Sequence, residues 1–250
     1  MSARTDIKYD TDGWLGTITI SNPPENRLTR PDFEELEVLE RFLATPGLKA
    51  VVVRGEGRHF CAGADLVLMR DQLSRDENGF ARSMGIGKSL LEAITAAPVV
   101  TLAEIRGSCL GAGLEIALAC HFRVASRNAM LGFPEVEHGF LPGLSGTVNA
   151  PTRVGRARAM DLILGGRMLR GEEAATIGLV DAAVPTSELE DAALGRLRAL
   201  TGERSVDQVR AIVTAVNNAL SLDAAQAQGE ETRLFVELAK ASLSRNGEER

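Results

Sequence analysis

Aromatic residues, cysteine and histidine are scarce in this sequence, and it contains no long apolar run. Phe, Trp and Tyr make up 4% of the 250 residues, and there are three cysteines and three histidines. A membrane-spanning helix needs about 20 apolar residues, and residues 1–6 do not supply the apolar core of a signal peptide. An odd number of cysteines does not make a disulfide framework. We therefore expect a cytoplasmic protein with reduced thiols and no membrane partner.

The sequence also lacks a cluster of basic residues. Its 28 Lys and Arg residues are scattered, and 34 Asp and Glu residues give a net charge of −6. Because binding to a phosphate backbone needs a basic face, nucleic acid is not an expected partner. The fractions of hydrophobic (44%) and charged (25%) residues are those of an ordinary globular protein with a full core.

No metal site is expected. His59, His121 and His138 do not stand at ligand spacing from one another or from the cysteines, so we interpret them as surface or hydrogen-bonded residues. His138 keeps some interest because it lies three residues after Glu135. Cys61 lies in a turn without an evident base to activate it, which favours a packing role over catalysis.

Two segments match functional motifs only in part. Residues 85–89 (GIGKS) resemble a phosphate-binding loop, but Arg82 stands where that motif requires glycine, and the segment lies inside an expected helix. Ser145 resembles the nucleophile of a strand-to-helix elbow, but Thr147 replaces the second glycine of that motif. We expect Ser145 to mark the start of a helix after a turn.

Strand and helix patterns alternate along much of the chain. Short apolar runs predict strands, and apolar residues at helical spacing predict helices. The alternation predicts an α/β fold with parallel strands, divided into a core at 1–190 with the active site and a helical region at 191–250. We expect strands at 15–20, 49–54, 99–105 and 122–125, helices at 31–45, 79–96, 114–119, 156–164, 171–177, 189–200, 206–220 and 224–243, and non-regular stretches at 55–63 and 71–78.

Two glutamates are the main candidates for catalysis. Glu115 and Glu135 are twenty residues apart, and each ends a turn marked by glycine or proline. Two carboxylates held by rigid turns can share a water and move protons, one as acid and one as base. The alternative is that each acidic residue only complements the dipole at the start of a helix.

Four segments lie in order around these glutamates: 59–66 (HFCAGADL), 110–115 (LGAGLE), 129–135 (AMLGFPE) and 139–143 (GFLPG), supported by 22–28 and 174–181. Taken together, they resemble the crotonase family of enoyl-CoA hydratases and isomerases. The resemblance implies a crotonase-like spiral of repeated ββα units with a helical C-terminal layer, assembled as a trimer or dimer of trimers.

The resemblance also implies a site. Backbone N–H groups of Ala64 and Ala112 would form an oxyanion hole for a thioester carbonyl, Glu115 would handle water, and Glu135 would give the proton to C2. Coenzyme A thioester would be the substrate, with no metal or redox cofactor. The remaining residues expected to contact the substrate are Ala62, Gly63, Asp65, Leu66, Gly111, Pro134 and Gly143.

Both glutamates together favour hydration of a 2-enoyl thioester, or dehydration of a 3-hydroxyacyl one. The alternatives are an isomerase that uses Glu135 alone and a non-catalytic accessory protein of the same fold. Val67, Ser145 and His121 depart from the family pattern, Val67 where many hydratases carry a basic residue near the nucleotide phosphates.

The C-terminal region, 191–250, is expected to be shorter than usual for the family, which keeps an acyl-carrier-protein thioester open as a substrate. Residues 66–78 and the helix that follows them, 79–96, are expected to line the acyl pocket, because loops of this kind carry specificity. Leu68, Met69 and Leu73 in that stretch suggest an apolar acyl group.

Overall fold

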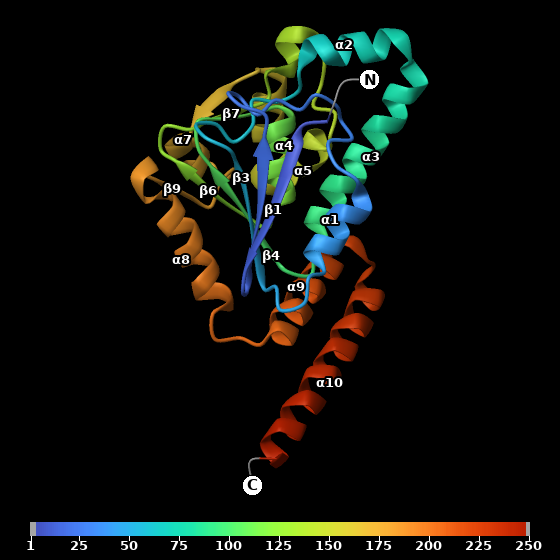
Figure 1. Cartoon of the computed structure of the whole chain (residues 1–250), viewed down its shortest axis with the longest axis vertical. Helices are drawn as coiled ribbons and strands as arrows, with labels where there is room; N and C mark the ends of the chain where they lie inside the picture. Colours follow the sequence, from blue (N-terminus) through green and yellow to red (C-terminus); the bar gives the residue numbers. More distant parts are fainter. Residues whose placement is uncertain (1–3, 249–250) are drawn as a thin grey trace.

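The computed structural model describes residues 4–248 as an α/β fold built on two sheets (Figure 1). In the six-stranded sheet the order is β1-β2-β3-β4-β6-β9, with an antiparallel β1–β2 pair and parallel pairing elsewhere. Its strands are β1 (Asp6–Asp12), β2 (Leu15–Ser21), β3 (Ala50–Gly55), β4 (Val100–Ile105), β6 (Phe122–Ser126) and β9 (Ala182–Val184). A three-stranded sheet has the order β5-β7-β8, with β5 (Ser108–Leu110), β7 (Met130–Gly132) and β8 (Met168–Arg170).

The central strands are apolar on both faces because both faces are covered. On β3, Val51 and Val53 pack into the larger core, whereas Val52 packs into a second core together with Leu102 of β4 and Leu197. This alternation follows from the two-residue period of a strand. Continuous apolar runs of this kind are typical of parallel strands buried between helices. The predicted α/β layering with parallel strands is confirmed.

The helices cover the sheets and extend the fold at its C-terminal end. All eight residues of α4 are buried, so this helix lies in the interior. Helix α8 packs on β3, β4 and β6, while α10 packs on α9 and projects away from the sheets (Figure 1). The helices are α1 (Leu36–Leu43), α2 (Leu66–Arg75), α3 (Glu77–Thr95), α4 (Ala112–Ala119), α5 (Gly146–Val154), α6 (Arg156–Leu164), α7 (Gly171–Thr176), α8 (Leu189–Thr201), α9 (Val206–Ser221) and α10 (Ala224–Glu248), with 3₁₀ turns η1 (Pro134–His138) and η2 (Thr186–Glu188).

Two predictions of local structure are wrong. The polar stretch 71–78 is helical on both sides of Asp76: α2 ends at Arg75 and α3 begins at Glu77. The Asp76 side chain caps α3 by accepting a hydrogen bond from the Gly79 N–H. Ser74, Arg75, Glu77 and Asn78 are exposed helix surface rather than a loop. The helix expected from residue 31 begins only at Leu36, because the preceding segment is held by a two-bond ion pair between Arg30 and the buried carboxylate of Asp32.

Other local expectations hold. Residues 85–89 lie within α3, and Ser145 directly precedes α5, as predicted. Cys61, Cys109 and Cys120 are buried free thiols. The strands that the patterns missed include four of only three residues, which are too short to show a period. The division at residue 190 stays a prediction.

Within the described part of the chain, no helix combines the length and the apolar character that a membrane crossing requires.

Asn26 holds together the loops that lead to the site. Its side chain is fully buried, its φ is +54°, and its Nδ2 donates hydrogen bonds to the carbonyls of Glu56 (2.9 Å) and His59 (2.7 Å). Two residues later, Leu28 donates to the Gly63 carbonyl at 2.9 Å. The turn around Asn26 therefore anchors the end of the 55–63 loop.

We expect Asn26→Ala to lower the free energy of unfolding by about 2 to 4 kcal/mol. The substitution leaves buried carbonyl groups unpaired, and it places alanine in a left-handed backbone conformation that asparagine tolerates better. Urea denaturation measures the change. Asn78→Ala, at an exposed position of α3, is the matched control and should shift stability by about 0.5 kcal/mol or less. Equal effects of the two substitutions would contradict the anchoring role.

Candidate active site

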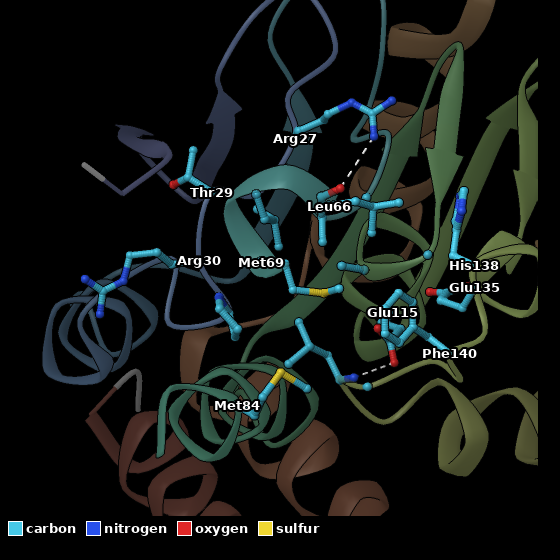
Figure 2. A pocket seen from close by; sticks show the side chains of 18 of the residues that line it. Arg27, Thr29, Arg30, Leu66, Met69, Met84, Glu115, Glu135, His138 and Phe140 are labelled. Atoms are coloured by element: carbon cyan, nitrogen blue, oxygen red, sulfur yellow. Dashed lines mark hydrogen bonds between the residues drawn. The ribbon is translucent and has the colours of Figure 1, made fainter. Parts of the chain in front are cut away.

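Loops that follow neighbouring parallel strands meet around one cavity of about 250 Å³ (Figure 2). Three segments of the chain reach the cavity: the first follows β3, the second follows β4 and β5, and the third follows β6 and β7. Because carboxyl ends of parallel strands lie at one edge of a sheet, these segments converge there. Ten of the predicted site residues line the cavity: Ala62, Gly63, Ala64, Leu66, Gly111, Ala112, Glu115, Pro134, Glu135 and Gly143.

Asp65, the remaining predicted contact residue, is not among the residues lining the cavity. Its carboxylate accepts hydrogen bonds from the N–H groups of Val67 (3.0 Å) and Leu68 (3.1 Å), which makes it the N-cap of α2. An Asp directly before an apolar helical run is a common capping signal. We therefore correct its assignment from substrate contact to helix cap.

The backbone around Ala64 lies against the start of α4. Gly63 has a φ of +96°, and a Cβ added to it would lie 3.0 Å from the Leu110 carbonyl oxygen and 3.9 Å from the Ala112 nitrogen. Among residues 4–248, the N–H groups of Ala64 and Ala112 donate no backbone hydrogen bond of a turn, loop or cap. Ala112 is the first residue of α4, where N–H groups are free and the helix dipole favours negative charge.

Glu115 is buried one turn into α4, with 1% of its surface exposed. Its Oε1 accepts hydrogen bonds from the N–H groups of Leu144 (2.7 Å) and Gly146 (2.6 Å). Burial raises the pKa of Glu115 to about 7, and the charge of Glu135 adds to this rise, while the two N–H donors oppose it. Glu115 is therefore a carboxyl group that can gain and lose a proton near neutral pH.

Glu135 extends into the same cavity from η1, directly after Pro134 (Figure 2). Burial raises its pKa, and its Oε2 is buried without a hydrogen-bond partner among the described residues. A Cβ at Gly111 would lie 2.6 Å from Oε1 of Glu135, so a side chain at this position would displace the carboxyl group from where it lies. The backbone turn before α4 thus determines where Glu135 can lie.

The two carboxyl groups suit acid–base chemistry. Both pKa values are raised, and the charge on one opposes ionisation of the other. Near neutral pH such a pair can hold one proton, so that one member acts as acid and the other as base. Within residues 4–248, no group of three or more His, Cys, Asp or Glu side chains is arranged to hold a metal ion.

Several lining residues were not expected from the sequence. Arg27 lies at one side of the cavity, where its guanidinium donates to Glu25 at 2.8 Å and to the Ala64 carbonyl at 3.5 Å (Figure 2). Its position within the recognised 22–28 turn was an available signal. Phe80 and Met84 reach the cavity from α3, the helix that was expected to line the acyl pocket, although no motif singled out these two residues. The other unexpected lining residues include Phe140, Leu141 and Leu144; of the expected apolar side chains, Met69 and Leu73 line the cavity and Leu68 does not.

We expect the stability of the wild type to fall relative to Glu115→Gln as pH rises. The folded protein keeps the proton of Glu115 up to about pH 7, whereas the unfolded chain loses it near its ordinary pKa of 4.5, so the advantage of the neutral carboxyl group disappears across that window. Urea denaturation at pH 5 and pH 8 should show a change of about 2 to 3 kcal/mol in the difference between the two proteins. Glu137→Gln, at an exposed position, is the control. Parallel pH profiles for the wild type and Glu115→Gln would contradict the buried titration.

Known proteins resemble this chain in sequence and in fold. A model of the family described as enoyl-CoA hydratase/isomerase matches residues 11–250. A Bacillus subtilis (strain 168) protein named "Probable enoyl-CoA hydratase" is 38% identical over 175 residues, which cover 70% of this chain and 67% of that protein. Pseudomonas aeruginosa DspI has a TM-score of 0.81 and 31% identity, covering 94% of this chain and 96% of its own.

A further solved structure shows a relative with a ligand. It is an enoyl-CoA hydratase homologue of Thermobifida fusca YX in complex with CoA, with a TM-score of 0.79, 27% identity and 94% coverage of both chains. The fold predicted from the sequence motifs, a crotonase-type α/β fold with a helical C-terminal region, is confirmed. By the extent of the family match, this chain belongs to the enoyl-CoA hydratase/isomerase family.

Proposed function

We propose that the protein adds water to a 2-enoyl-CoA thioester to form a 3-hydroxyacyl-CoA, and catalyses the reverse dehydration. The observation that carries this proposal is the pair of glutamates with raised pKa values in one cavity beside two available N–H groups. The Thermobifida fusca homologue in complex with CoA supports coenzyme A as the carrier.

The N–H groups of Ala64 and Ala112 would bind the thioester carbonyl oxygen. As the nucleophile adds to C3, negative charge moves onto that oxygen, and donors held by the backbone stabilise it without rearranging. The dipole of α4 favours the same charge, because Ala112 opens that helix. This stabilisation is specific to the enolate-like state and therefore lowers the barrier rather than only tightening substrate binding.

Glu115 would act as the base and Glu135 as the acid. Ionised Glu115 takes a proton from water, the water oxygen bonds to C3, and the C2–C3 π electrons shift to form the enolate. Neutral Glu135 then gives its proton to C2, and the thioester carbonyl is restored. Glu115 then loses its proton and Glu135 gains one, either directly between the two groups or through solvent, which restores the starting state. Water is therefore the only co-reactant. No metal or redox cofactor is required by this balance.

The hydrogen bonds of Glu115 support its assignment as the base, because the two N–H donors favour its ionised form. The N–H groups of Leu144 and Gly146 both bind Oε1, which leaves Oε2 for a water. On Glu135 it is Oε2 that lacks a partner. Each glutamate therefore offers one oxygen to the reaction.

Assembly as a trimer or dimer of trimers remains a prediction from the family resemblance.

Isotope labelling tests the reaction class. Incubation of the protein with a 2-enoyl-CoA in H₂¹⁸O should place one ¹⁸O atom in the 3-hydroxyacyl product, measured by mass spectrometry, with parallel loss of the enoyl absorbance. A 3-enoyl product without label would instead establish isomerisation by proton transfer alone. Binding of the thioester without either product would favour a non-catalytic role.

Single substitutions should separate the two glutamates. We expect Glu115→Gln and Glu135→Gln each to lower kcat for hydration by about 10² to 10⁴, because each removes one proton-transfer group. Glu137→Gln, on the same 3₁₀ turn but outside the cavity lining, should keep wild-type kinetics. An isomerase would behave differently: Glu115→Gln would retain double-bond migration, and only Glu135→Gln would abolish it.

A further inference from the structure

The inner wall of the cavity is closed by tight packing between α3 and two loops. The methyl group of Met84 packs so closely on the backbone of Gly143 that a Cβ on that glycine would lie 2.6 Å from it. One turn further along α3, a Cβ on Gly87 would lie 2.5 Å from the Pro31 carbonyl oxygen and 2.8 Å from Leu144. A chain that enters from the glutamates therefore cannot continue through α3.

The opposite side of the cavity is open and lined by apolar side chains. Leu73 of α2 is 37% exposed, Phe140 is 37% exposed and Leu141 is 65% exposed, yet all three line the cavity. We call these three residues the apolar rim. They continue the apolar interior formed by Met69 and Met84, which point into the cavity from α2 and α3 (Figure 2). Exposed apolar side chains gathered at the edge of one pocket are typical of a surface that an apolar group covers.

The rim connects two elements that the core does not hold tightly together. Helix α2 has no fully buried residue, although four of its side chains line the cavity. Across the opening, the guanidinium of Arg70 on α2 lies 5.9 Å from the centroid of the Phe140 ring. A cation–π contact at an exposed site is weak, about 1 kcal/mol or less. The two sides of the rim can therefore adjust to an occupant at little cost.

We propose that the substrate carries an apolar acyl chain longer than the closed part of the cavity, and that its distal methylenes cover the apolar rim. The proposal rests on the proposed function, since it concerns the acyl end of the same thioester. The rim residues line the same cavity as Glu115 and Glu135, and this continuity favours the substrate's own chain as the occupant. A second copy of this protein on the rim is the rival occupant.

Binding of saturated acyl-CoAs tests the rim independently of catalysis. Isothermal titration calorimetry would compare decanoyl-CoA with butyryl-CoA, both of which lack the double bond that hydration needs. We expect the wild type to bind decanoyl-CoA more tightly, and Leu141→Ser to lower the decanoyl-to-butyryl affinity ratio by about fivefold, because contacts to the distal methylenes are lost. Leu141→Met should keep the ratio.

Leu164→Ser is the matched control, because Leu164 is 72% exposed on α6 and does not line the cavity. It should leave the affinity ratio at the wild-type value. Sedimentation of each variant reports on the rival occupant. The proposal is overturned if Leu141→Ser leaves the decanoyl-to-butyryl affinity ratio unchanged. If, in addition, the assembly of Leu141→Ser dissociates, the rim binds a second copy of the protein.

Rates on the matching 2-enoyl-CoAs separate this proposal from the proposed function. If the wild type hydrates enoyl-CoAs but shows no rim-dependent preference for chain length, the rim proposal fails and the function stands. If acyl-CoA affinity depends on the rim but no enoyl-CoA is hydrated, the proposed function fails and the rim proposal stands.

Discussion

The close approach of the 61–63 backbone to the start of α4 is the constraint on which the site depends. A Cβ on Gly113 would lie 2.2 Å from the Cys61 carbonyl oxygen, and one on Gly63 would lie 3.0 Å from that of Leu110. Glycine at these positions allows two backbone segments to touch without side chains between them. The contact brings the N–H groups of Ala64 and Ala112 to one wall of the cavity, and the other groups of the site are arranged around it.

The same helix that offers an N–H group also buries a carboxyl group. Placing Glu115 inside α4 costs stability above neutral pH, because a buried charge loses the solvation of water, and the two N–H donors from the turn before α5 offset only part of this cost. The unfavourable burial is what moves the pKa of Glu115 to about 7, where a proton can be exchanged under ordinary conditions. Stability and acid–base chemistry thus oppose each other at this residue.

The parts of the molecule around the site differ in how firmly they are held. Helix α4 is entirely buried, so the Ala112 N–H group and Glu115 stand on a rigid element. Helix α2 and the Phe140–Leu141 segment contribute exposed apolar side chains to the cavity lining. Rigid support for Glu115 and a less firmly held apolar lining fit the proposed single chemistry with some tolerance in chain length.

The sequence by itself determined the alternation of strands and helices, the position of α4, and the motifs that place Glu115 and Glu135 in an enzyme family, because these depend on local patterns along the chain. Only the tertiary structure decided that Leu144 and Gly146, about thirty residues after Glu115, bind its carboxylate, and that Asp65 caps α2 instead of lining the cavity. The packing of Met84 on Gly143 and the exposure of Phe140 and Leu141 at the cavity were likewise not visible in the sequence. Burial, pKa and cavity shape arise from contacts between distant segments, and such contacts leave no periodic signal.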